Sequence, residues 1–127
     1  MLSVKMDETN GTALFEPHGP LSEKDFSHAA EVINAWIGKH GHLKGLVIHA
    51  RVFPGWDSLG ALSSHLVFIR DHHRKIDRVA FATDSAVGHV AGKIARHFVK
   101  AEIRLFPYRE LEQARLWIAG NSSGEPH

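Results

Sequence analysis

The sequence predicts one α/β domain built on a mixed β-sheet. Two short apolar runs, residues 3–6 and 12–17, flank Asn10-Gly11, a dipeptide that tolerates the positive φ angles of a tight hairpin turn. Beyond this antiparallel hairpin, short apolar runs alternate with segments whose apolar residues recur at helical spacing. Strands that alternate with helices form right-handed βαβ crossovers. We therefore expect the later strands to be parallel.

The first helix is expected to begin after Ser22. The serine hydroxyl is placed to cap the helix N-terminus, and Asp25 occupies the third helical position. The apolar residues that follow have the spacing of one buried helix face: Phe26, Ala29, Ala30, Ile33, Trp36 and Ile37. Gly38 or Gly41 can end this helix.

The centre of the chain predicts a buried parallel strand over residues 46–50, because this apolar run is too short for a helix. A loop over residues 51–56 follows, with Pro54-Gly55 at its turn. Asp57 or Ser58 can cap a second helix. Its buried face is expected to carry four aliphatic residues at helical spacing: Leu59, Leu62, Leu66 and Ile69.

The rest of the chain repeats the strand and helix pattern twice. Residues 79–82 predict a strand, and Asp84 or Ser85 can cap a helix with the apolar positions Val87, Val90, Ala91, Ile94 and Phe98. Residues 101–105 alternate apolar and charged side chains, as in a half-exposed strand. A last helix is expected to end at Gly120, with the apolar positions Leu111, Ala114, Trp117 and Ile118.

Length and composition indicate a single domain over residues 1–119, followed by a polar tail over residues 120–127 that we expect to be disordered. With 127 residues, of which 43% are hydrophobic, the chain can bury its own core. It has no cysteine, no secretory signal pattern and no apolar run near the ~18 to 20 residues that span a bilayer. We therefore expect a cytoplasmic protein without a transmembrane segment.

The charge balance argues against a nucleic-acid partner. The net charge of +1 and the pI near 8.2 fall below the pI of ~9 that is typical of nucleic-acid-binding domains. The basic residues gathered over residues 70–78 are interpreted as a solvated face that complements a helix C-terminus. The 11 histidines would add positive charge on mild acidification, because imidazole titrates near pH ~6.5.

Three segments of the chain form a recognisable set: Phe53-Pro54-Gly55-Trp56-Asp57, His73-x-Lys75-Ile76-x-Arg78-Val79-Ala80 and Glu110-x-x-x-Ala114-x-x-Trp117-Ile118. Together they resemble the SpoIIAA-like bacterial family, which is similar to the STAS domain of sulfate transporters and anti-sigma factor antagonists. The resemblance covers residues 4–118 and implies a small mixed sheet with helices mostly on one face. Members also look like the lipid-carrying domain of eukaryotic transfer proteins, which implies a hydrophobic cleft for a small apolar ligand.

The sequence departs from the anti-sigma factor antagonists at one functional position. In those proteins, a serine within an Asp-Ser-Ser-Gly motif at the start of the second helix is phosphorylated. Setting Asp57-Ser58-Leu59-Gly60 on that motif places Leu59 at the phosphorylated position. We therefore expect Ser58 to cap the helix and not to act as a phosphorylation switch.

The candidate binding site lies after the predicted central strands, because open α/β sheets offer a ligand crevice at the carboxyl ends of their strands. Its residues are Phe53, Trp56, Asp57, Ser58, Asp84 and Ser85. A structural interpretation competes, in which the aromatic residues close the core and the polar residues only cap helices. A hydrophobic ligand could be lined by Trp36, Phe53, Trp56 and Phe68.

A metal site is not supported by the spacing of the histidines. His40-Gly41-His42 and His72-His73 lack a ligand pattern, because adjacent helical residues point about 100° apart and no His-Glu-x-x-His motif occurs. His65 lies seven residues before His72 on one helical face, and solvent exposure explains that pair. We expect no metal.

Catalysis and cofactor binding also lack a motif. Asp57, Ser58 and either His49 or His65 could form a triad, but no Gly-x-Ser-x-Gly elbow is present. Neither a Walker loop nor a Gly-x-Gly-x-x-Gly motif occurs, so we expect no cofactor. These absences predict a protein that is not an enzyme.

The sequence thus favours a non-enzymatic binding or regulatory module. We expect it to engage a protein partner through residues 53–58 and the exposed side of the second helix. Two alternatives stay open: a carrier or sensor of a small hydrophobic, lipid-like ligand, and a hydrolase whose site no motif reveals. A homodimer is compatible with these functions.

Overall fold

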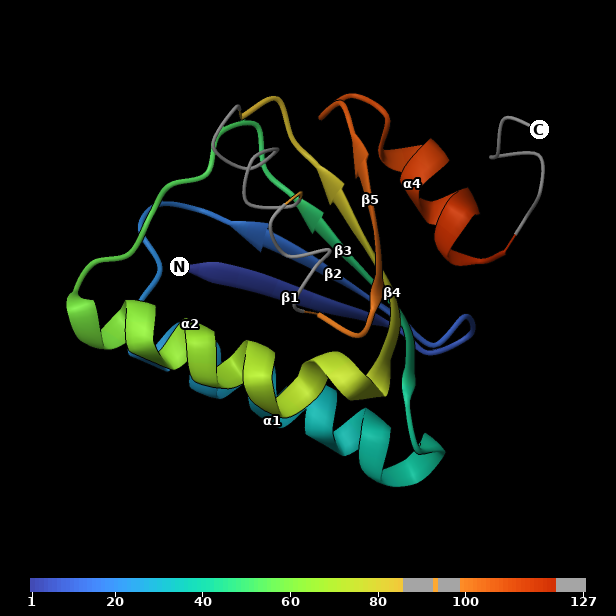
Figure 1. Cartoon of the computed structure of the whole chain (residues 1–127), viewed down its shortest axis with the longest axis horizontal. Coiled ribbons are helices and arrows are strands. Elements are labelled where there is room, and N and C mark those ends of the chain that lie inside the picture. Colours follow the sequence, from blue (N-terminus) through green and yellow to red (C-terminus); the bar gives the residue numbers. More distant parts are fainter. Residues whose placement is uncertain (86–92, 94–98, 121–127) are drawn as a thin grey trace.

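The computed structural model describes residues 1–85, 93 and 99–120, which contain a five-stranded mixed sheet (Figure 1). The strands lie in sequence order, and β1 pairs antiparallel with β2 while all later pairs are parallel. The predicted α/β fold, with a hairpin followed by parallel strands, is confirmed. Its elements are β1 (Leu2–Asp7), β2 (Thr12–Pro17), α1 (Glu23–His40), β3 (Leu43–His49), α2 (Leu59–His72), a short 3-10 helix η1 (His73–Lys75), β4 (Ile76–Ala82), β5 (Glu102–Phe106) and α4 (Leu111–Ile118).

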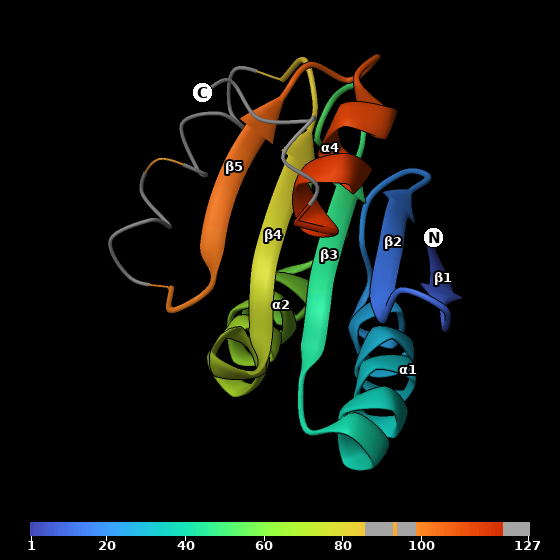
Figure 2. The same ribbon diagram turned by 90° about the vertical axis from the view of Figure 1, so that its right-hand side faces the viewer.

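Helices cover both faces of the sheet. α1 and α2 lie on one face and α4 lies on the other (Figure 2). Successive side chains of a strand point to opposite faces, so Leu46 of β3 joins the core under α1 and α2 while Val47 joins the core under α4. The helix predicted over residues 87–98 and the tail over residues 121–127 lie outside the described residues.

The hairpin turn is longer than the tight Asn10-Gly11 turn that the sequence suggests. Asp7 is opposite Thr12, so residues 8–11 form the connection. Gly11 has a φ of 68°, and Asn10 does not adopt a positive φ. The carboxylate of Asp7 instead accepts the backbone N–H of Asn10 at 3.2 Å, which holds the longer turn closed.

The predicted start of α1 is confirmed in atomic detail. The Ser22 hydroxyl accepts the Asp25 N–H at 3.1 Å, and the Asp25 carboxylate accepts the Ser22 N–H at 2.8 Å. This reciprocal capping box satisfies two backbone donors that the helix itself cannot pair. Gly41, with a φ of 85°, ends the helix.

The buried face of α2 differs from the prediction. Leu59 and Leu66 are 85% and 60% exposed, whereas Ala61, Phe68 and His72 are buried. Both sets have helical spacing, so periodicity alone could not choose between them. The helix turns Phe68 toward the core and leaves Leu59 and Leu66 outside. The phenyl ring is a larger apolar group than a leucine side chain, so its burial removes more apolar surface from water.

The packing of α4 depends on a glycine in the central strand. β3 begins at Leu43, three residues before the predicted start, and therefore includes Gly45. A side chain at Gly45 would overlap Ile118 of α4. Its absence lets the predicted apolar face of α4, with Ala114, Trp117 and Ile118 buried, lie directly on the sheet. None of the helices in the described ranges is long and apolar enough to cross a membrane.

Candidate functional site

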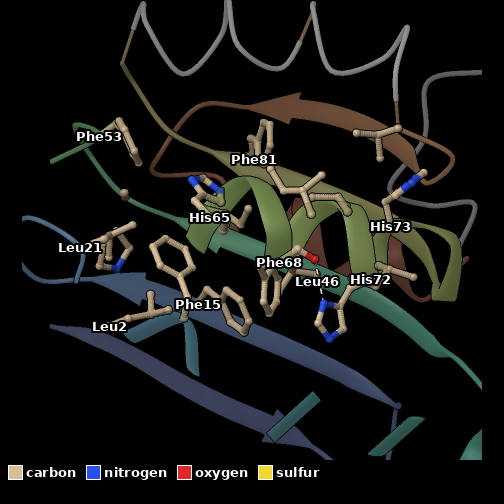
Figure 3. Close-up of a pocket in the computed structure, with 18 of the residues that line it drawn as sticks. Leu2, Phe15, Leu21, Leu46, Phe53, His65, Phe68, His72, His73 and Phe81 are labelled. Atoms are coloured by element: carbon tan, nitrogen blue, oxygen red, sulfur yellow. Dashed lines mark hydrogen bonds between the residues drawn. The ribbon is translucent and has the colours of Figure 1, made fainter. Parts of the chain in front are cut away.

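An apolar cavity of about 280 Å³ lies between the sheet and the layer formed by α1 and α2 (Figure 3). All five strands, both helices and the loop before α2 contribute side chains to its lining. None of the described lining residues is Asp, Glu, Lys or Arg. The described lining includes five phenylalanines and one tryptophan: Phe15, Phe26, Phe53, Trp56, Phe68 and Phe81.

The loop before α2 is fixed to the chain segment that precedes α1. The Leu21 N–H donates to the Gly55 carbonyl and the Asp57 N–H donates to the Leu21 carbonyl, each at 2.9 Å. Gly55 has a φ of 80°, a conformation that residues with side chains rarely adopt. This turn brings Trp56 into the cavity lining and leaves it 37% exposed, so the lining reaches the surface at this residue.

Trp56 and its neighbours form a small aromatic cluster at this end of the cavity. The rings of Phe53 and Trp56 pack edge to face, with centroids 5.1 Å apart. The Trp56 indole N–H donates to Nδ1 of His65 at 3.1 Å, and the His65 ring stacks on Phe26 with centroids 4.8 Å apart. Burial lowers the pKa of His65, because it disfavours the charged imidazolium.

Two further histidines lie at the other end of the lining. His72 is buried, with Nδ1 2.7 Å from the Phe68 carbonyl oxygen and Nε2 3.0 Å from the side-chain oxygen of Asn34 (Figure 3 shows the first bond). His72 thereby links α2 to α1. His73 accepts the backbone N–H of Lys100 at Nδ1, at 2.9 Å.

The structure brings together two of the six predicted site residues, Phe53 and Trp56, in the cavity lining. Asp57 and Ser58 are not among the lining residues. The Ser58 hydroxyl accepts the Ala61 N–H at 3.0 Å and caps α2, as expected. Asp57 has an exposed side chain.

The second predicted turn, Asp84 and Ser85, is separate from the lining as well. The Asp84 carboxylate accepts the Tyr108 N–H at 3.0 Å, and the buried Ser85 donates its N–H to the Thr83 hydroxyl at 3.1 Å. Thr83 itself lines the cavity. In the described structure this turn therefore connects β4 to the segment that follows β5.

Sequence reasoning missed the two histidines of α2 and misplaced one tryptophan. His65 and His72 were expected to be solvent-exposed, but both line the cavity and His72 is buried. Their spacing with Ala61 and Phe68 is helical, which is the signal that could have found them. Trp36 is not in the lining, because its ring packs over Gly11 and stacks on His40 instead.

The residues suggested for a triad do not converge. His49 has Nδ1 3.0 Å from a Glu16 carboxylate oxygen and Nε2 3.0 Å from the Tyr108 carbonyl oxygen. Within the described residues, no hydrogen bond joins Ser58 to His49 or His65. In the same part of the chain, no group of three or more His, Asp or Glu side chains is arranged to hold a metal ion.

Comparisons with known proteins agree with this fold. A family model described as SpoIIAA-like matches residues 13–119. The chain is also similar to the crystal structure of an uncharacterized protein of the DUF3478 family with a SpoIIAA-like fold, from Shewanella loihica PV-4. The two are 18% identical with a TM-score of 0.70, over 93% of this chain and 92% of that chain. Among curated proteins, none matches.

Proposed function

The chain belongs to the SpoIIAA-like family, and we propose that this domain binds a small apolar molecule between its sheet and the α1 and α2 layer. In this proposal it acts as a carrier or sensor without catalysing a reaction. The observation that supports it is the cavity of about 280 Å³ with an almost wholly apolar lining. Ligand sites in proteins are concave, mostly apolar and carry few polar groups.

An empty apolar space of this size destabilises a protein, because the surrounding side chains lose packing contacts in proportion to the missing volume. Water fills such a space poorly, since each molecule needs two to four polar partners. An apolar ligand restores these packing contacts, and its own apolar surface is removed from water when it binds. The volume is close to the lower end of the roughly 300 to 1,000 Å³ that ligand pockets span, so the cavity suits a small molecule such as one with a single aromatic ring.

Isothermal titration calorimetry with propiophenone, a small aromatic ketone, tests the proposal. We expect saturable binding to the wild-type domain. Ala50 lines the cavity, so Ala50→Phe should fill it and abolish binding. Ala119→Phe places the same new ring at an exposed position after α4 and should leave binding unchanged. Absence of binding to the wild type, or equal binding to both variants, would contradict the proposal.

A second candidate function, binding of a protein partner, is favoured by the outer face of α2. Leu59, Leu66 and Val67 are all exposed there, and clustered exposed apolar side chains mark many interaction sites. One such partner is a second copy of the chain, and an experiment on the purified protein alone can test for it. Sedimentation velocity should then show a dimer that Leu66→Ser dissociates. A monomer at every concentration would exclude the homodimer.

A further inference from the structure

We infer that the ligand of this cavity is an uncharged molecule with a hydrogen-bond acceptor at one end, such as a ketone or an ester, and that Nε2 of His65 donates to that acceptor. This inference rests on the proposed function and specifies its ligand class. It follows from which atom of His65 is already paired, from how the ring is held, and from the absence of charge in the described lining.

The hydrogen bond from Trp56 determines where His65 carries its proton. The indole N–H can only donate, so Nδ1 of His65 must accept. The neutral ring then has its proton on Nε2. Nε2 has no hydrogen-bond partner within the described residues. No fully buried side-chain nitrogen or oxygen of the described residues lacks a partner, so Nε2 faces accessible space.

The ring is also held in place before any ligand arrives. Its face stacks on Phe26 of α1 and its Nδ1 is bonded to Trp56. Figure 3 shows His65 projecting from α2 toward the end of the cavity that Phe53 lines. A donor that is fixed in its bound orientation loses little conformational freedom on binding, which favours affinity.

The described part of the lining offers no partner for a charged ligand. An ionised carboxylate would leave water without gaining a counter-charge, because the described lining contains no Lys or Arg. Burial lowers the pKa of His65, so the imidazole does not readily supply a positive charge. A neutral carbonyl group needs only one donor and loses less hydration. An uncharged acceptor therefore fits this end of the cavity better than a fatty-acid carboxylate.

Three probes of similar size separate these chemistries in calorimetric titrations: propiophenone, butylbenzene and hydrocinnamate. The measured quantity is the ratio of the propiophenone affinity to the butylbenzene affinity in each protein. A net hydrogen bond changes an affinity by roughly two- to tenfold, so His65→Phe should lower this ratio about two- to tenfold. Hydrocinnamate should bind the wild type more weakly than propiophenone does. His28→Phe, on the exposed face of α1, should keep the wild-type ratio.

The outcomes distinguish this inference from the proposed function. If no probe binds the wild type, both are wrong. If butylbenzene binds and His65→Phe leaves the affinity ratio unchanged, only the inference is wrong. The inference is also wrong if His73→Phe, and not His65→Phe, lowers the ratio. Should His65→Phe fail to fold, nitrogen-15 spectra of the wild type decide. Propiophenone must shift the His65 Nε2–H resonance more than butylbenzene does, and equal shifts would overturn the inference.

Discussion

The Trp56 indole N–H donates to Nδ1 of His65 across 3.1 Å, and this bond joins the loop before α2 to the helix itself. Trp56 also forms a β-bridge with Leu21, which precedes α1. One tryptophan therefore ties the loop, the segment that precedes α1, and α2 together at the edge of the cavity. The bond exists only while Nδ1 is unprotonated, because two N–H groups cannot pair. The protonation state of His65 is thus coupled to the local structure.

We expect His65 to make the domain less stable on acidification. Burial lowers the pKa of His65 in the folded protein below its ordinary value of 6.5, so on acidification the unfolded chain takes up this proton first. Its contribution to stability is complete above pH 6.5 and is lost as the pH falls toward the folded pKa. Urea melts at about pH 7.5 and about pH 5.5 measure the loss in unfolding free energy. The loss should be smaller in His65→Gln, and an equal loss in both proteins would refute the prediction.

Two substitutions on α2 should differ strongly in their effect on stability. Phe68 is buried, with ring centroids 6.2 Å from Phe15 and 6.4 Å from Phe26, so Phe68→Ala should cost about 3 to 5 kcal/mol. Leu66 is 60% exposed, so Leu66→Ala should cost less than about 1 kcal/mol. Denaturant melts of the two variants measure both values. A larger loss for Leu66→Ala would mean that the other face of α2 is buried.

Gly45→Ala should destabilise the domain by roughly 1 to 3 kcal/mol, because the added methyl group would overlap Ile118 in a well-packed core. Ile118→Ala alone should cost about 2 to 5 kcal/mol through the space that it leaves. The two changes compensate in volume, so the double variant should be more stable than the sum of the single effects predicts. Strict additivity in urea melts would show that α4 does not rest on β3 at this glycine.

Much of the fold could be predicted because its signals are local. Ser22 and Asp25 lie three residues apart, and their capping box depends only on that spacing. The apolar runs that became β3 and β4 are too short for helices and are flanked by turn residues. The apolar face of α4 was also identified correctly, because its sequence offers no competing face.

The candidate site could be predicted only in part, because its geometry depends on distant contacts. Phe53 and Trp56 were found from the Pro54-Gly55 turn that precedes a helix. The role of His65 depends on Trp56, nine residues earlier, and on Phe26 from another helix. The cavity itself is space left between five strands and two helices, and no local pattern in the sequence reports such a volume.

Trp56 should report on ligand binding through its fluorescence. It is the only tryptophan among the described lining residues, and its 37% exposure places part of the indole in water. Trp36 packs over Gly11, and Trp117 is buried under α4 on the opposite face of the sheet. Butylbenzene is a suitable probe, because it has no carbonyl group that could quench the indole directly. Filling the cavity should exclude water from Trp56 and shift its emission to shorter wavelength.

The matched control for this experiment is Trp56→Phe, which keeps the other two tryptophans and an aromatic ring at the cavity edge. We expect the emission of the wild type to shift as butylbenzene is added, and the emission of Trp56→Phe to stay constant even where calorimetry shows that the variant binds. Because Trp36 and Trp117 lie outside the described lining, a shift in both proteins would mean that the probe binds elsewhere. If calorimetry detects binding but neither spectrum changes, Trp56 does not contact the ligand. Its ring would then serve only to close the core, together with Phe53.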